Sequence, residues 1–586
     1  MSDGPPSDLA HASSAAPELP EESVDAAGTD VACEESESGE LARFDSPRTV
    51  GLILLVLAPF LLIPIAHVLS DPESATGFFH YELPYYVANG RAAFERGDGV
   101  FYPNPYDPAE DAPVIYAHWL PWIFGALTAK LGFDPGDVVL AFTFFAAIGF
   151  AWVTRKLVHL RTESCGQADF AFVLAMTGGG LLACAGLLAS FGTESNLADS
   201  ILNFDPGRGM WFLNWGRNAL FPTEAVYHTL VAACWIAEIR HRSRWANVFL
   251  LLLITTHPWS GLELLFTINL WRGIEFLRQP TRIRRNQLAV AVVFLTAFLG
   301  YYKLWLPTFP SHAQLQSVWE LNWSLSWTVA ALAYLPVLIP CILQVRRQMR
   351  GGSLTGTERF LLCALVVAIG LAFHDRLINP VQPLHFTRGY VWMPLFLIGL
   401  PVILETVSSL QRRSVAKAVL AAGMLLFVFD NLTFSIVHLQ RQLAKTDGFH
   451  LNADERALMS DLDKAAMGTT VLTDSATLNY LLPTYANVRP WLGPHFNTPS
   501  FPNRRQTWEQ CFSGDTVKLE FVPADVDMVL LRRQRHAEQH NTAAATEDVP
   551  SWRPVELRNA TWMGLRKTQN SDAGTDRIAS APDDAL

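Results

Sequence analysis

Charge is scarce in this chain of 586 residues. Only 17% of the residues are charged and 50% are hydrophobic, whereas a soluble globular protein carries about a quarter of its residues charged. The net charge of −11 comes almost entirely from residues 1–49, which hold twelve acidic and two basic residues. The remainder of the chain is therefore poor in charge and rich in apolar runs, which indicates a membrane protein.

Several catalytic motifs are also missing. The sequence has no Gly-x-x-x-x-Gly-Lys-Ser/Thr, which excludes a P-loop nucleotide site, and no His-Glu-x-x-His. Its seven cysteines are scattered without a Cys-x-x-Cys pair, so no zinc-ligand spacing is present. We interpret the triple glycine of 177–182 as a place of close helix packing, because small residues let helix backbones approach.

Both ends of the chain are polar. Residues 1–49 are rich in Ser, Ala, Pro and Glu, and such a composition predicts a disordered tail. The tail is too acidic to be a signal peptide, and we expect it in the cytoplasm. The polar stretch 568–586 is expected to be a second disordered tail.

Apolar runs of about 20 residues mark the expected membrane spans. Basic clusters at 240–244, 278–285, 346–350 and 411–413 alternate with them and predict the cytoplasmic side. An odd number of spans then places the C-terminal part on the exoplasmic face. The eleven expected spans are 50–69, 137–155, 168–191, 222–238, 246–256, 259–276, 286–305, 324–344, 357–373, 390–404 and 417–437.

One apolar segment does not fit this alternation. Residues 114–132 contain Pro121 beside two tryptophans, and a full crossing here would put the following basic residues outside. We therefore expect a helix in the outer interface, within a long first exoplasmic loop over 70–136.

The C-terminal part differs in character from the membrane part. Residues 453–466 have the pattern of an amphipathic helix, and 470–474 and 526–533 that of short buried strands. The predicted fold class is mainly α. A polytopic transmembrane helical bundle over 50–437 precedes a small exoplasmic α/β domain over 438–567.

The first loop contains the strongest candidate for chemistry. Glu82 follows the first span and precedes Pro84, Tyr85 and Tyr86. A carboxylate at a membrane surface among aromatic residues is either a solvated loop acid or a general base that also anchors a substrate hydroxyl.

The order of motifs in 77–157 resembles the GT-C superfamily. The motifs are an acidic residue before Pro-Tyr-Tyr, then Tyr-Pro, an interfacial helix ending Lys-Leu-Gly, and a span ending Arg-Lys-Leu. That family consists of multi-pass glycosyltransferases that use polyprenyl-phosphate-linked sugars, among them protein mannosyltransferases and aminoarabinose transferases. The resemblance extends over about 50–437 and implies a divergent bacterial member, a hexosyl or pentosyl transferase of the cell envelope.

The resemblance implies roles for individual residues. Glu82 takes the acidic position of the catalytic base, and Arg388 lies in a late exoplasmic loop where the family holds the donor phosphate. Arg217 and Lys303 are further candidates for the phosphate. The candidates for substrate binding are His80, Tyr85, Tyr86, His257 and His385.

Structural interpretations compete with some of these roles. Arg217 and Glu224 are spaced for an ion pair, and Lys303 at the end of a span suits a snorkelling side chain. His257 sits at the tip of a short hairpin, where a helix-terminal hydrogen bond is the commoner use.

No cofactor and no metal ligand is assigned. A divalent metal is the one cofactor that the family pattern suggests, but His80-Tyr81 stand where that pattern has a second acid. The implied partners are a polyprenyl-phosphate-linked sugar donor, a lipid, glycan or protein acceptor, and the membrane, with no nucleic acid. The implied location is the bacterial inner membrane.

Two other functions fit the same topology. A transporter or lipid flippase would also be polytopic, although no inverted repeat is evident. A non-catalytic membrane assembly protein would act through its C-terminal domain. Convergence of Glu82, Arg388 and Arg217 on one site would favour the transferase over both.

Overall fold

The structure is a computed structural model of the whole chain. It describes residues 47–191, 197–319, 321–410, 414–465, 467–513 and 517–532, together with most of 552–567. Leu54–Leu586 forms one compact unit, and the residues before it belong to another. Residues 1–46 of the predicted tail 1–49, the predicted tail 568–586 and the basic cluster 411–413 lie outside the described residues, whereas 47–49 form the start of helix α2 (Pro47–Ser70).

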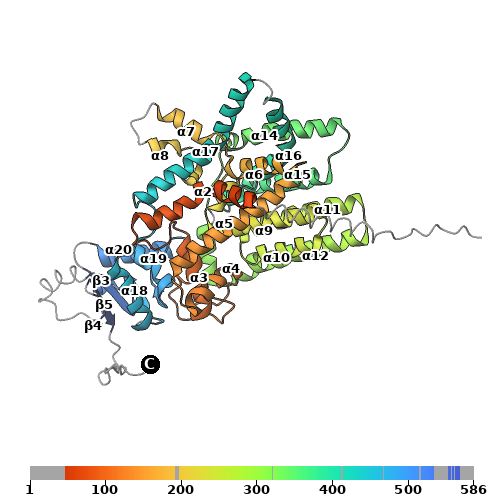
Figure 1. Cartoon of the computed structure of the whole chain (residues 1–586). Helices are drawn as coiled ribbons and strands as arrows, with labels where there is room; N and C mark the ends of the chain where they lie inside the picture. Colours follow the sequence, from red (N-terminus) through yellow and green to blue (C-terminus); the bar gives the residue numbers. More distant parts are fainter. Residues whose placement is uncertain are drawn as a thin grey trace, which may run out of the picture. The chain divides into compact units, whose positions relative to one another are not determined.

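Helices dominate the part up to Leu443 (Figure 1). Several begin with proline in the first turn, where the missing N–H is no loss. The α-helices are α2 (Pro47–Ser70), α3 (Leu83–Glu95), α4 (Trp119–Gly125), α5 (Pro135–His159), α6 (Cys165–Thr177), α7 (Leu182–Ser190), α8 (Leu197–Ile201), α9 (Pro222–Ile239), α10 (Ser243–Ile254), α11 (Pro258–Arg278), α12 (Arg282–Leu299), α13 (Pro310–Trp319), α14 (Trp327–Arg350), α15 (Gly356–Ala372), α16 (Trp392–Leu410) and α17 (Ser414–Leu443).

Each predicted span overlaps one of these helices, yet the count of eleven is not confirmed. Within the described chain, six helices are long and apolar enough to cross a membrane, or up to seven with the bent pair α6–α7. Helices α9 and α11 carry buried glutamates, and α10 has only 12 residues. A helix of that length reaches about 18 Å, less than the roughly 30 Å of a bilayer core. The helices identify the chain as a multi-pass membrane protein.

The triple glycine lies at the bend between α6 and α7, where the helix axes turn by 47°. A side chain on Gly180 would strike the backbone of Ala333, which confirms the predicted close packing. The carboxylate of Asp430 accepts hydrogen bonds from the amides of Gly180 and Ala183, at 2.7 and 2.8 Å. The exposed amides of the bend are thereby satisfied from α17.

The first loop contains α3, α4 and the short π-helix η1 (Ala126–Lys130). The predicted interfacial helix over 114–132 is shorter than expected, because Tyr116 pairs with Tyr102 as an isolated β-bridge before the helix begins. Helices α3 and α4 cross at two glycines, Gly90 and Gly125, whose backbones touch. This contact fixes the helix that follows Glu82.

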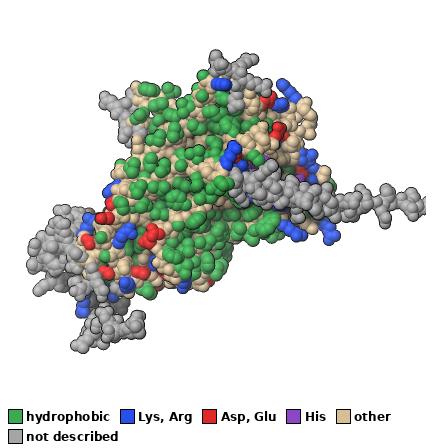
Figure 2. Space-filling model, in the orientation of Figure 1, with side chains coloured by type: hydrophobic (Ala, Val, Ile, Leu, Met, Phe, Trp, Pro, Cys, Tyr) green, Lys and Arg blue, Asp and Glu red, His purple; other side chains and the backbone are tan. Residues whose placement is uncertain are grey.

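The C-terminal part is a small α/β domain, as predicted. Its five-stranded sheet has the order β2-β1-β3-β5-β4, and β1, β2 and β3 run parallel while β4 and β5 form an antiparallel hairpin. The elements are α18 (Ala453–Ala465), β1 (Thr470–Thr473), α19 (Ala476–Tyr485), β2 (Arg489–Pro490), α20 (Phe501–Phe512), β3 (Met528–Arg532), β4 (Trp552–Val555) and β5 (Trp562–Lys567). Charged side chains gather on this domain, whereas the helical part shows a broad apolar face (Figure 2).

The crossing at Gly90 gives a first prediction. In Gly90→Ala the new Cβ would overlap the carbonyl oxygen of Pro121 and lie 2.5 Å from the amide nitrogen of Gly125. Overpacking of this kind destabilises by about 1–3 kcal/mol, so the melting temperature of the purified protein should fall. Gly149→Ala is the control, since nothing lies within 4 Å of its Cβ. Equal melting temperatures for the two variants would contradict the described crossing.

Candidate functional site

Glu82 occupies the N-cap position directly before α3, but its side chain does not cap the helix. Leu83 and Pro84 follow as the first helical residues, and the Glu82 side chain makes no hydrogen bond to the helix N-terminus. The carboxylate is half-buried, and it has no hydrogen-bond or ion-pair partner in the described part of the chain. An acid in this state keeps its acceptor lone pairs available to a ligand.

His80 lies next to Glu82 and is held by it. The Nδ1 atom of His80 accepts the backbone N–H of Glu82 at 3.3 Å, and its ring contacts Phe221 with centroids 4.3 Å apart. Burial lowers the pKa of His80 to about 4, so the imidazole is neutral at neutral pH. Since Nδ1 is the acceptor, the ring proton is on Nε2, which is free to donate.

Tyr85 and Tyr86 present hydroxyl groups from the first turn of α3. Tyr85 stacks on Tyr106 with centroids 6.2 Å apart, and the Tyr86 hydroxyl interacts with Thr223 at the start of α9. Burial raises the pKa of both tyrosines. They are therefore neutral hydrogen-bonding groups at neutral pH.

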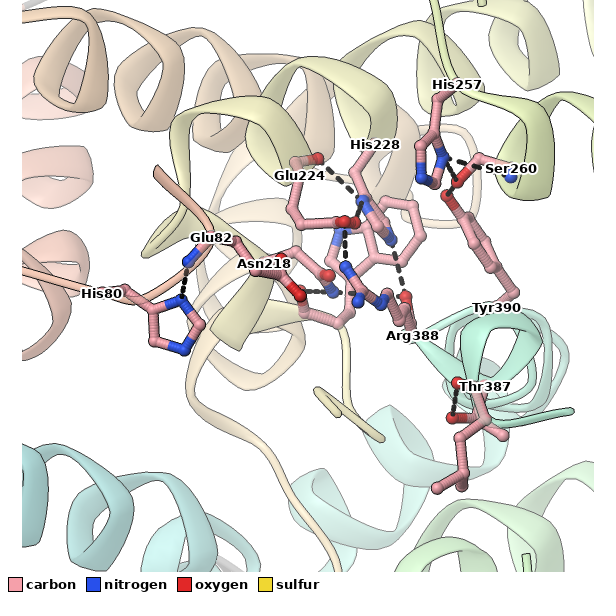
Figure 3. A network of polar contacts seen from close by, with 12 residues as sticks. His80, Glu82, Asn218, Glu224, His228, His257, Ser260, Thr387, Arg388 and Tyr390 are labelled. Atoms are coloured by element: carbon pink, nitrogen blue, oxygen red, sulfur yellow. Dashed lines mark hydrogen bonds and ion pairs between the residues drawn. The ribbon is translucent and has the colours of Figure 1, made fainter. Parts of the chain in front are cut away.

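A buried ion pair faces this loop. The carboxylate of Glu224, in the first turn of α9, accepts a hydrogen bond from Nη1 of Arg388, and their side chains are only 1% and 5% exposed. Figure 3 shows the two side chains end to end, with His228 beside them. The His228 ring nitrogens lie 2.8 Å from the Glu224 carbonyl oxygen and 2.6 Å from that of Arg388. His228 therefore ties together the backbones that present the pair.

A chain of aromatic and hydroxyl groups continues from His228. Tyr390 stacks on His228 at 4.6 Å, and its hydroxyl donates to Oγ of Ser260 at 2.6 Å (Figure 3). Ser260 in turn lies 2.9 Å from Nδ1 of His257, which also accepts the Ser260 amide as the N-cap of α11. His257 is thus a helix-terminal hydrogen bonder that also joins the network around Arg388.

Tryptophans enclose the last predicted substrate residue. His385 stacks on Trp259 with centroids 4.9 Å apart and meets the edge of Trp211 at the same distance. The guanidinium of Arg388 lies over Trp211 at 5.4 Å. His385 is therefore brought to Arg388 by a shared aromatic neighbour.

Three polar atoms around this pair are buried without a hydrogen-bond partner among the described residues. They are Nε of Arg388, Oε2 of Glu224 and Nδ1 of His385. A buried donor or acceptor left unpaired costs about 1–3 kcal/mol. These unpaired donors and acceptors lie together around Arg388, where they could bind polar atoms of a ligand.

The two halves of the site interact electrostatically. The carboxylate of Glu82 is close enough to Arg388 and Glu224 for their charges to act on one another. The structure thus brings together Glu82, Arg388, His80, Tyr86, His385 and His257. The pairing of Glu224 with Arg388 was not predicted, because Glu224 was matched to Arg217 on sequence spacing.

Arg217 belongs to a different network. Its Nη1 donates to Asp205 at 2.5 Å, its Nε to Asn431 at 2.8 Å, and its Nη2 to the carbonyl oxygen of Asp430 at 3.0 Å. The expected Arg217–Glu224 ion pair is wrong, since each partner is taken by another residue. The guanidinium is 1% exposed, and its donors are occupied.

Lys303 lies apart from these residues. It is exposed in the short π-helix η4 (Gly300–Trp305) at the end of α12. It interacts electrostatically with His312 in α13. A long cationic side chain at the end of an apolar helix suits snorkelling.

Two residues beyond the last predicted span, 417–437, also belong near the first loop. Asp447 and His438 interact electrostatically with His80, and the Oδ2 atom of Asp447 lies 3.4 Å from Nδ1 of His438. Some 360 residues separate them from the first loop, and no sequence signal links them to it. Over the described ranges, no group of three or more His, Cys, Asp or Glu side chains is arranged to hold a metal ion.

Comparison with known proteins gives little similarity. No protein-family model matches the chain, and no curated protein matches it in sequence. Similar solved structures include the archaeal oligosaccharyltransferase AglB from Archaeoglobus fulgidus, in complex with an inhibitory peptide and a dolichol-phosphate. The two are 12% identical with a TM-score of 0.41, over 89% of this chain and 75% of that chain. A TM-score of this size does not establish a common fold.

The ion pair yields a second prediction. Glu224→Gln leaves the Arg388 charge buried without its counter-charge, and breaking a buried pair costs about 3–5 kcal/mol. Glu405→Gln removes an acid from a pair with Arg347 that is 63% and 64% exposed, which is worth about 0–1 kcal/mol. Thermal unfolding should therefore shift strongly for Glu224→Gln and little for Glu405→Gln. A shift of equal size would show that Arg388 does not depend on Glu224.

Proposed function

We propose that this protein is a membrane glycosyltransferase that moves a sugar from a polyprenyl-phosphate donor to an acceptor on the exoplasmic face. The observation that carries the proposal is the state of Glu82. Its carboxylate is half-buried and unpaired among the residues that the structure describes, and it lies within electrostatic reach of Arg388. A free acid beside a cation supplies the two groups that an inverting transfer needs.

The reaction has a simple balance of bonds. The bond between the sugar C1 and the phosphate oxygen breaks, and the polyprenyl phosphate leaves with the electron pair. A new bond forms between C1 and the acceptor oxygen, whose proton passes to Glu82. The guanidinium of Arg388 stabilises the charge on the departing phosphate, because a planar cation with free N–H groups suits phosphate oxygens.

The surrounding residues suit this division of labour. Arg388 has an unpaired Nε beside Trp211 and His385, which supports a role in holding the phosphate. His80 is neutral and has a free Nε2–H, which suits a donor to a sugar or acceptor oxygen. Tyr85 and Tyr86 would supply aromatic surface next to Glu82. We do not include Arg217 and Lys303 in the proposed site, because one is fully occupied and the other is remote.

The catalytic role of Glu82 gives a third prediction. Glu82→Gln keeps the shape of the side chain but cannot take a proton, so transfer should fall by a factor on the order of 10²–10⁴. The assay follows radiolabelled hexoses and pentoses from their polyprenyl phosphates into membrane acceptors, with purified protein in nanodiscs. Glu73→Gln is the control, since Glu73 is an exposed acid of the same loop. Full transfer by Glu82→Gln would remove Glu82 from the reaction.

The phosphate site gives a fourth prediction. The double variant Arg388→Gln/Glu224→Gln removes the cation without leaving a buried charge, so folding should be retained. Undecaprenyl phosphate should then bind roughly tenfold to hundredfold more weakly, as expected for the loss of a charged hydrogen bond. Native mass spectrometry of the detergent-solubilised protein measures the bound lipid.

Matched variants separate this effect from general loss of charge. Arg347→Gln/Glu405→Gln removes an exposed pair of the same composition and should bind the lipid as the wild type does. Equal binding by both double variants would exclude Arg388 as the phosphate ligand. Uptake of labelled solute into proteoliposomes, with no transfer from any donor, would favour a transporter instead.

A further inference from the structure

The loop that carries Glu82 has no regular secondary structure. Several of its backbone carbonyl groups nevertheless accept hydrogen bonds from other parts of the chain. The carbonyl oxygen of Phe78 accepts the amide of Phe449 at 2.9 Å. The next carbonyl, that of Phe79, accepts Nε2 of Gln442, also at 2.9 Å. Both donors come from the end of α17 and the segment that follows it.

Helix α19 of the C-terminal domain holds the other side of Glu82. The hydroxyl of Tyr480 donates to the carbonyl oxygen of Tyr81, and the two rings stack with centroids 4.9 Å apart. Further along, Oγ1 of Thr484 donates to the carbonyl oxygen of Pro84 at 3.2 Å. The two donors lie one helical turn apart on α19, so one face of this helix is hydrogen-bonded to the start of α3.

The segment after α17 is itself fixed against the loop. Residues 447–451 run antiparallel to 74–78, with Ala75 opposite His450. The amide of Leu451 donates to the carbonyl oxygen of Ser74 at 2.8 Å, and the amide of Thr76 donates to the carbonyl oxygen of Phe449 at 3.2 Å. This short ladder sets the register of the segment that reaches the carbonyl of Phe78.

Tyr480 is also held in place by Tyr106 and the residues around it. Its carbonyl oxygen accepts the hydroxyl of Tyr106 at 3.0 Å, and Tyr106 stacks on Tyr85 of α3. The Tyr480 ring is buried in a cluster with Ala88 and Tyr106. Tyr480 is therefore a rigid contact between the C-terminal domain and the loop.

We infer that the C-terminal part of the chain positions Glu82, and that Tyr480 is the positioning residue which holds the peptide before it. The inference rests on the proposed function of Glu82. An irregular loop has many backbone conformations to choose from, and a misplacement of about 1 Å can cost a reaction about 10²-fold. Hydrogen bonds on both sides of Glu82 restrict that freedom without touching the carboxylate.

Tyr480→Phe tests the inference because it keeps the ring and its stacking and removes only the hydroxyl, which donates to Tyr81 and also meets the backbone of Tyr85 at the start of α3. Two quantities are measured on the full chain in nanodiscs. Amide hydrogen exchange over 78–86 should speed up by roughly fivefold to tenfold, the order for one hydrogen bond. The kcat of sugar transfer should fall about tenfold, while the KM for the donor stays unchanged, because Arg388 is untouched.

Tyr485→Phe is the matched control. Tyr485 lies on the same helix and packs against Phe78 with centroids 6.0 Å apart, but its buried hydroxyl has no hydrogen-bond partner among the described residues. Its removal should change neither exchange nor kcat. Thr484→Val, which removes the bond to Pro84, should act in the same direction as Tyr480→Phe.

Each outcome bears on one claim. If Tyr480→Phe and Tyr485→Phe are equal in exchange, Tyr480 does not hold the loop. If Tyr480→Phe speeds up amide exchange but leaves kcat unchanged, the contact between Tyr480 and the loop does not position Glu82, and the inference also fails. If the wild type transfers no sugar from any donor, the proposed function fails, while the exchange comparison still decides whether Tyr480 holds the loop.

Discussion

A membrane interior offers no water to solvate a charge or a free backbone group, so each must find its partner within the protein. Several buried groups of the helical part follow this constraint. Arg272 is paired with Glu238 inside the bundle, Arg161 with Glu358, and the carboxylate of Asp430 satisfies the amides exposed where α6 and α7 bend. These contacts join α11 to α9, the connection after α5 to α15, and α17 to the bend, and breaking any of them would leave a charge or amide buried alone.

Several polar groups around Glu82 and Arg388 have no such partner. The acid of Glu82 has no protein partner in the described ranges, and Arg388 uses Nη1 for Glu224 while its buried Nε remains unpaired. Unpaired polar groups reduce stability. Other buried atoms of the described chain are also unpaired, such as Oε2 of Glu263, but those around Arg388 lie within electrostatic reach of the acid of Glu82. An acid beside a cation in this state supports the proposed site for a hydroxyl and a phosphate.

The sequence predicted the features that depend on local pattern. Hydropathy located every long helix, the amphipathic pattern of 453–466 located α18, and the short buried-strand patterns of 470–474 and 526–533 located β1 and β3. The number of spans is not confirmed: α10 and α15 have fewer than 18 residues, and α9 and α11 carry buried glutamates, of which Glu238 is paired with Arg272. The pairing of Glu224 with Arg388 was missed for another reason. Glu224 is 164 residues away, and spacing along the chain carries no information about such a contact. Only the resemblance pointed to Glu82 and Arg388 together.

The same limitation explains why the C-terminal part looked like an independent domain. Its own pattern predicts a sheet with a hydrophobic core, and that core is present. Yet the residues that face Glu82 are hydroxyl, amide and backbone groups: Tyr480, Thr484, Gln442 and the amide of Phe449. Such groups are neutral and common, and no sequence motif distinguishes the ones that make these contacts. A loop without regular structure must take its hydrogen bonds from somewhere, and here they come from the last third of the chain. The domain is therefore as much a support for the first loop as a unit of its own.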